Sequence, residues 1–175
     1  ATCSWPPRAW QRGAPATSGV WREQRSCPRR TRVIERSKLF GRYVAGGFDG
    51  NNYLGAAQVY DPAANSWTPA GTLGTPRRDH TASLLPSGRV LIVGGTDGNG
   101  PLADAEIYDP VSNTFTPTGA LPAGRNYHAA VVLATGDVMI FGGESANGPL
   151  ADVQRYDAIS GTFSNLVDGA IVAIN

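Results

Sequence analysis

The chain has 175 residues, of which 41% are hydrophobic and 17% charged, and it contains 22 Gly and 13 Pro. That length is typical of one ordinary domain, and abundant Gly and Pro with few charges favour short strands and tight turns over long helices. No apolar stretch approaches the ~20 residues of a membrane-spanning helix, and the net charge of +1 excludes no class of partner by itself.

The N-terminal part, residues 1–40, is expected to be an irregular basic segment, distinct from the domain formed by residues 41–175. Residues 1–42 carry a net charge of +8, whereas residues 43–175 carry −7. Arg and Trp side chains can bind phosphates and stack on bases, but charge runs without periodicity are more often solvated and unstructured. A nucleic-acid arm is therefore the less favoured interpretation. A third hypothesis is that this Arg-, Pro-, Ser- and Trp-rich stretch is read out of frame.

Both cysteines, Cys3 and Cys27, lie in this segment. A disulfide between them would stabilise the chain by about 3 kcal/mol, and two free thiols are an equal alternative. Two cysteines alone make no zinc site. Residues 1–42 show no apolar core of a secretory signal, and the chain does not begin with Met, which indicates a processed form or a fragment.

A unit of 48 residues recurs from about residue 41 onwards. It runs from an apolar strand with a glycine pair, through a polar loop and a strand ending in Tyr-Asp, to a short strand around one aromatic residue. An Arg-x-x-His element and a further strand then lead into the next glycine pair. The residues in register are Tyr60, Tyr108 and Tyr156; Trp67, Phe115 and Phe163; Arg77 and Arg125; and His80 and His128. Four short strands per unit predict one propeller blade per unit.

These motifs resemble the kelch-repeat family, from about residue 41 to residue 166. The resemblance implies an all-β fold, a partial β-propeller. Two complete four-stranded blades are expected at 77–118 and 125–166, with a three-strand remnant at 42–68 after the irregular N-terminal segment. Because a propeller closes with roughly four to eight blades, the chain is expected to be a fragment of a larger propeller or to self-associate through its open blade faces.

The polar residues of the repeats give few candidates for chemistry. His80 and His128 are expected to bond to backbone or Asp groups across blades, with metal ligation or acid–base catalysis as the less favoured alternative. Arg77 and Arg125 are expected to pair with Asp or carbonyl groups, because a packing residue repeats whereas a catalytic residue is usually unique. The glycine pairs open no helix and so are not a phosphate loop. Calcium binding near the loop carboxylates is a weaker alternative to solvated turns. No catalytic, cofactor or metal residue is predicted.

The favoured function is a binding scaffold, because loops on a rigid β framework usually carry recognition. The candidate loops are 48–55, 96–103 and 144–151, which vary in sequence while their frame does not. Their candidate binding residues are Asp49, Asn51, Asn52, Tyr53, Asp97, Asn99, Glu144 and Asn147. The expected partner is a protein, with carbohydrate as an alternative, and an extracellular or cell-surface location is favoured. The other hypothesis, suggested by the resemblance, is the propeller part of a galactose-oxidase-like copper oxidase whose ligands lie outside this chain.

Overall fold

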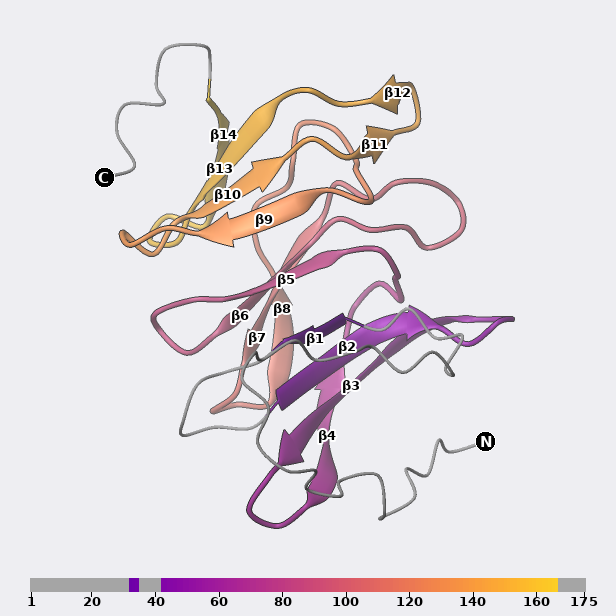
Figure 1. The fold of residues 1–175 in the computed structure, drawn as a ribbon, viewed down its shortest axis with the longest axis vertical. Coiled ribbons are helices and arrows are strands. Elements are labelled where there is room, and N and C mark those ends of the chain that lie inside the picture. Colours follow the sequence, from indigo (N-terminus) through magenta and orange to yellow (C-terminus); the bar gives the residue numbers. More distant parts are fainter. Residues whose placement is uncertain (1–31, 35–41, 167–175) are drawn as a thin grey trace, which may run out of the picture.

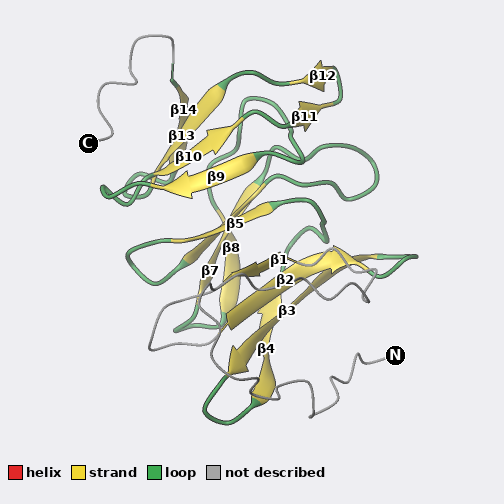
Figure 2. Ribbon diagram, in the orientation of Figure 1, coloured by secondary structure: helices red, strands yellow, loops and turns green. Residues whose placement is uncertain are grey.

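A computed structural model describes residues 32–34 and 42–166, and every regular element in that part of the chain is a β-strand (Figures 1 and 2). Those residues include no helix that could cross a membrane. Cys3, Cys27, most of the basic N-terminal segment and residues 167–175 lie outside the described residues. The expectations for a disulfide, a nucleic-acid arm and an out-of-frame origin therefore remain sequence-based.

Three four-stranded antiparallel sheets follow one another along the chain. In each sheet the strands are neighbours in chain order. The first comprises β1 (Arg32–Ile34), β2 (Arg42–Phe48), β3 (Tyr53–Asp61) and β4 (Ser66–Thr72). The second comprises β5 (Thr81–Leu84), β6 (Val90–Val93), β7 (Ala105–Asp109) and β8 (Thr114–Pro117). The third comprises β9 (Ala129–Val132), β10 (Val138–Phe141), β13 (Val153–Asp157) and β14 (Thr162–Asn165), with a small hairpin, β11 (Glu144–Ser145) and β12 (Gly148–Pro149), in its loop.

The first sheet has one strand more than the sequence predicted. The expected three-strand remnant is completed by β1, which pairs antiparallel with β2 so that Val33 lies opposite Val44. Three residues are too few to show the alternation that marks a strand. The repeat itself gives the signal, because Val33 stands 48 residues before Thr81, where β5 begins.

The sheets stack as consecutive blades of a propeller arc. β5 lies between β1 and β9, and β4 contacts β8, so the first strands of all three sheets share one edge of the stack. Figure 1 shows the sheets following one another along the long axis of the molecule. This arrangement confirms the predicted all-β, partial-propeller fold.

Apolar side chains fill the space between neighbouring sheets. Strand β6 contributes to both layers, because Val90 and Ile92 face the first sheet while Leu91 and Val93 face the third. All four are almost completely buried, at about 1.5–3 kcal/mol of hydrophobic stabilisation each. A strand covered on both faces reads as a continuous apolar run rather than an alternating one, which explains the run that precedes the glycine pair.

The repeated tyrosines anchor the outer half of each blade. Tyr108 stacks on Phe115 at a centroid distance of 4.9 Å, and its hydroxyl donates to Asn113 Oδ1 at 2.8 Å. The third sheet has Gly161 where Asn113 stands in the second, so no such amide is available. There the Tyr156 hydroxyl bonds instead to Thr118 Oγ1 of the preceding link, at 2.9 Å.

Replacing Ile92 by Ala removes buried methyl groups between the first two sheets and leaves a cavity. We expect the free energy of unfolding to fall by about 2–5 kcal/mol. Denaturant unfolding followed by circular dichroism measures it. The matched control is Ile159→Ala, at a side chain that is 99% exposed, where a change within about 0.5 kcal/mol is expected. Equal effects at both positions would contradict the assignment of the core.

Candidate functional site

The two arginines of the Arg-x-x-His elements are structural groups inside the blades. Arg77 is fully buried and donates to the Gly94 carbonyl at 3.0 Å and to Glu106 Oε1 at 2.8 Å, and it also pairs with Asp104. Arg125, also fully buried, donates to the Gly142 carbonyl at 3.0 Å. These contacts confirm that the arginines bind carbonyl and carboxylate groups of their own blades.

The second arginine obtains its counter-charge from one residue. Arg125 Nη1 and Nη2 donate to the two oxygens of Asp152, at 3.0 and 2.9 Å. This two-pronged pair fits the planar guanidinium to the carboxylate, and the hydrogen bonds from Arg125 lower the pKa of Asp152. The buried charge of Arg125 therefore depends on an ionised Asp152.

The second and third sheets differ at one buried position, which holds a carboxylate in the second and an amide in the third. The backbone that faces this position explains the difference. Glu106 accepts from the Gly74 amide at 2.8 Å in addition to Arg77. In the next unit Pro122 replaces Gly74 and Gln154 replaces Glu106. Because proline has no N–H to donate, a carboxylate at position 154 would lose one of the donors that offset its burial.

The histidines lie buried where successive blades meet. His128 Nε2 and Thr81 Oγ1 are 2.7 Å apart, so the third sheet is tied to the second. His80, in the same register, lies with Cε1 about 3.1 Å from where a Cβ on Gly46 would be. Both histidines therefore sit at inter-blade contacts, as predicted, and His128 meets the hydroxyl of Thr81, a group that the prediction did not include.

The backbone of the same element completes the connection between blades. The Gly47 amide donates to the Arg77 carbonyl at 2.8 Å, and the Gly95 amide donates to the Arg125 carbonyl at 2.9 Å. Each arginine thus binds its own blade through its guanidinium and the preceding blade through its carbonyl. We call this arrangement the inter-blade lock. It explains why the glycine pair and the Arg-x-x-His element recur together.

The predicted loop residues of the first two blades form side-chain-stabilised turns. Asp49 Oδ1 accepts from the amides of Asn51 and Asn52, at 2.9 and 2.8 Å. Asp97 Oδ1 accepts from the Asn99 amide at 2.8 Å, and this backbone bond is the main cause that lowers the Asp97 pKa. Across the described residues, no group of three or more His, Cys, Asp or Glu side chains is arranged to hold a metal ion.

The first two loops touch each other through an aromatic group. Phe48 and Tyr53 lie with ring centroids 5.0 Å apart, and the Arg78 guanidinium lies over both rings, at 4.9 and 5.4 Å from their centroids. Gly98 of the second loop lies so close to the Tyr53 ring that a Cβ there would come within 2.6 Å of it. Loops 48–55 and 96–103 therefore form one continuous surface.

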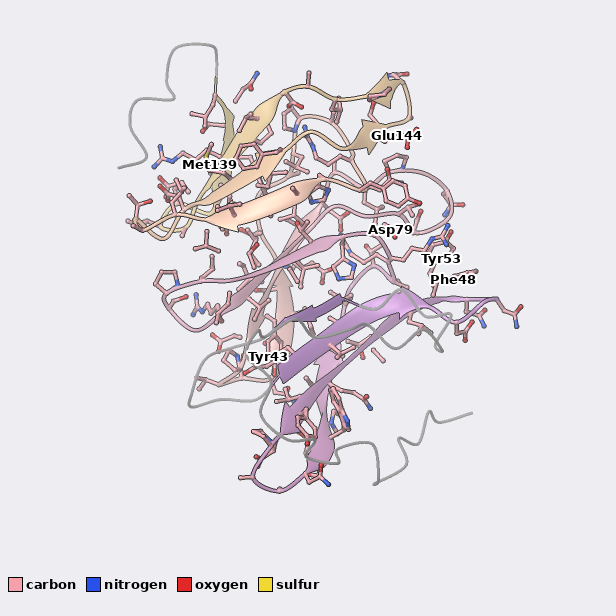
Figure 3. The ribbon with its side chains drawn as sticks, in the orientation of Figure 1. Tyr43, Phe48, Tyr53, Asp79, Met139 and Glu144 are labelled. Atoms are coloured by element: carbon pink, nitrogen blue, oxygen red, sulfur yellow. The ribbon has the colours of Figure 1, made fainter. Side chains whose placement is uncertain are left out.

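That surface extends to the third loop through residues of the Arg-x-x-His elements. The Tyr127 amide donates to the Asp79 carbonyl at 3.3 Å. Asn126, beside Tyr127, forms an isolated bridge with Glu144, at the start of the third loop. In the same loop the Asn147 amide donates to Ser145 Oγ at 3.2 Å. Figure 3 shows Phe48, Tyr53, Asp79 and Glu144 along one edge of the molecule, opposite Tyr43 and Met139.

The sequence did not predict the middle of this surface. Tyr127 is 52% exposed and has a φ of 54°, and Asp79, at the same place in the preceding unit, has a φ of 56°. Such a backbone conformation is uncommon outside glycine and is a genuine outlier for a bulky residue. The sequence does mark these positions, because they differ between repeats while the Arg and His on either side do not. The two residues are Arg78-Asp79 in one unit and Asn126-Tyr127 in the next.

Replacing Asp152 by Asn should weaken the fold and flatten its response to acid. The folded-state pKa of Asp152 is lowered, so its ionised form adds stability above the unfolded pKa of about 3.9. That stability is lost as the pH falls through the folded pKa. We expect the variant to lose about 2–3 kcal/mol at pH 7, less than a fully buried pair, and to lose less than the wild type between pH 7 and pH 3. Urea midpoints measure both. Parallel acid responses would contradict the role of Asp152.

Replacing Gly94 by Ala should disturb the inter-blade lock. A Cβ at this residue would lie 2.5 Å from the Arg125 carbonyl oxygen and 3.0 Å from His128 Cε1. Gly148→Ala is the control, because Gly148 also has a positive φ but nothing lies within 4 Å of its Cβ position. Backbone strain costs about 1–3 kcal/mol at such positions, and the φ of 112° at Gly148 is less favourable for alanine than the 60° at Gly94, so a larger loss at Gly94 than at Gly148 reports the clash with the next blade. Thermal unfolding compares them, and equal losses would argue against the lock.

The comparison with known families agrees with this architecture. A family model described as the KLHDC2/KLHL20/DRC7 Kelch-repeats domain matches residues 10–169, a range that includes all three sheets. No curated protein matches the chain. Kelch repeats build propeller blades, and such domains are generally protein-interaction scaffolds rather than enzymes. The repeated lock, the three four-stranded sheets and the family match lead to one conclusion: the chain belongs to the kelch-repeat family.

Proposed function

We propose that this chain binds a protein partner through one continuous surface, which we call the loop face. The loop face consists of Phe48, Asp49, Tyr53, Arg78, Asp79, Asp97, Tyr127 and Glu144. The observation that carries the proposal is the contact chain from Tyr53 through Arg78 and Asp79 to Tyr127. It joins the variable positions of three repeats on a constant framework. A scaffold that holds variable residues together in this way suits recognition better than it suits core packing.

The composition of the loop face favours a basic segment of the partner. Asp49 and Glu144 are exposed and Asp97 is half-exposed, so three carboxylates are distributed over the three loops. The amide of Asn99 lowers the pKa of Asp97 and so favours its ionised form. The positive charge of Arg78 is engaged by Phe48, Tyr53 and the Asp79 carboxylate, which lies 3.4 Å from Arg78 Nε. Complementary charge across an interface mainly sets the association rate and specificity.

Tyr127 supplies the apolar part of the proposed contact. It is an exposed aromatic side chain on a backbone that is fixed by the buried Arg125 and His128 on either side. Tyrosine is enriched among residues that dominate binding energy, because it offers a large contact area and one polar group at low entropic cost. We therefore expect Tyr127 to be the anchor of the loop face, with the carboxylates around it orienting the partner.

Selection from a random peptide display library on the immobilised chain tests this proposal. We expect enriched peptides rich in Lys and Arg, with affinities that fall as salt rises. Tyr127→Asn should weaken the best peptide about tenfold or more, corresponding to about 1.4 kcal/mol. Asn is chosen because it tolerates the left-handed backbone. Val111→Ala, at an exposed turn outside the loop face, should leave binding unchanged. Peptides that bind the Tyr127 variant equally well, or no enrichment at all, would contradict the proposal.

A further inference from the structure

We propose that two copies of this chain close into one six-bladed ring, in which the third sheet of each copy packs on the first sheet of the other. The inference goes beyond the loop face and concerns the two end faces of the arc. For each sheet, the trailing face is the one directed toward the next sheet along the chain, and the leading face is the one directed toward the preceding sheet. The second sheet has both of its faces covered, whereas among the described residues no sheet packs on the leading face of the first sheet or on the trailing face of the third.

The trailing face of the third sheet carries apolar residues where the second sheet has an interface. Phe141 is 37% exposed, whereas Val93, at the same place in the second sheet, is 1% exposed. Met139 corresponds in the same way to the fully buried Leu91. Val131 in the neighbouring strand β9 is also exposed. The trailing face of the third sheet therefore carries the kind of apolar residues that form the blade interface in the second sheet.

The glycine pair of the third sheet also has the backbone conformation that contacts a following blade in the first two sheets. A Cβ on Gly46 or Gly94 would meet the arginine carbonyl of the next sheet, at 2.6 and 2.5 Å. Gly142 holds the same place with a φ of 56°, and a Cβ there would meet only Leu150 of its own sheet. The glycine pair of the third sheet thus has the conformation of the inter-blade lock, but no arginine carbonyl of the described residues lies against it.

The leading face of the first sheet offers the matching surface. Trp67 is 40% exposed, whereas Phe115, at the same place in the second sheet, packs into the core between the first two sheets. Val44 corresponds to the buried Ile92, which faces that core.

The count and symmetry of the sheets favour a closed dimer over an open chain. The three four-stranded sheets that the structure describes make six in a pair, which lies within the four to eight blades that close a propeller. The third sheet of each copy contacts the first sheet of the other, and a two-fold rotation makes this contact twice, so the pair is a closed, isologous dimer in which every described sheet has a neighbour on both faces. The interface also continues one already built in the chain, because the same register positions meet between the first and second sheets and between the second and third.

The mass of the purified chain in reducing buffer, from size-exclusion chromatography with light scattering, tests the closed dimer. We expect twice the 18.4 kDa of one chain over a range of protein concentrations. Phe141→Lys on the trailing face and Trp67→Lys on the leading face should each give monomers with unchanged circular dichroism. Ile159→Lys, at an exposed turn on neither face, should stay dimeric. If Phe141→Lys fails to fold, Val131→Lys replaces it.

Mixing the two monomeric variants tests whether the third sheet of one copy contacts the first sheet of the other. The mixed pair retains one unaltered contact, between the trailing face of the Trp67 variant and the leading face of the Phe141 variant, so a dimer should reappear. A wild-type monomer, a dimer that resists either variant, or a mass that grows with concentration without limit would each overturn the proposal. Failure here leaves the loop face untouched, because its peptides are tested on a separate surface.

Discussion

The structure depends on two arginines that are completely buried. Arg77 and Arg125 each donate from the guanidinium to a carbonyl and a carboxylate of one blade, while their main-chain carbonyls accept an amide from the preceding blade. Burying a cation costs several kcal/mol unless it is paired and hydrogen-bonded, and Asp152 provides that compensation for Arg125. Each of the two arginines consequently fixes the first strand of its own blade relative to the preceding blade.

The inter-blade lock also explains the form of the loop face. Arg and His of each element are buried, and the residue before each His adopts a left-handed backbone conformation: Tyr127 is exposed there, whereas the Asp79 side chain is mostly buried beside Arg78. Because the buried pair is constant, the pair between them can change without loss of the fold. The same element therefore carries both stability and the variable part of the surface, and it connects the candidate loops to one another.

Much of the fold follows from periodicity alone. The spacing of 48 residues predicts the strands, the aromatic anchors at Trp67, Phe115 and Phe163, and the structural role of the arginines. It misses β1, because a strand of three residues gives no pattern of its own and is visible only by register. The positions of the loops were also predictable, but the contacts that join the loops into one surface were not. The contact of Tyr53 with Gly98 and the stacking of Arg78 depend on how neighbouring blades pack, which a single sequence does not encode in its local pattern.

Amide hydrogen exchange at Gly47 and Gly95 tests the inter-blade lock most directly. Both amides donate to an arginine carbonyl of the next blade, so they should exchange only through global unfolding. Gly100, in an exposed loop with nothing near its Cβ position, provides the fast reference in the same experiment. Protection of Gly47 and Gly95 close to the free energy of global unfolding is the expected result. Exchange as rapid as that of Gly100 would show that the blades are not held together through the arginines.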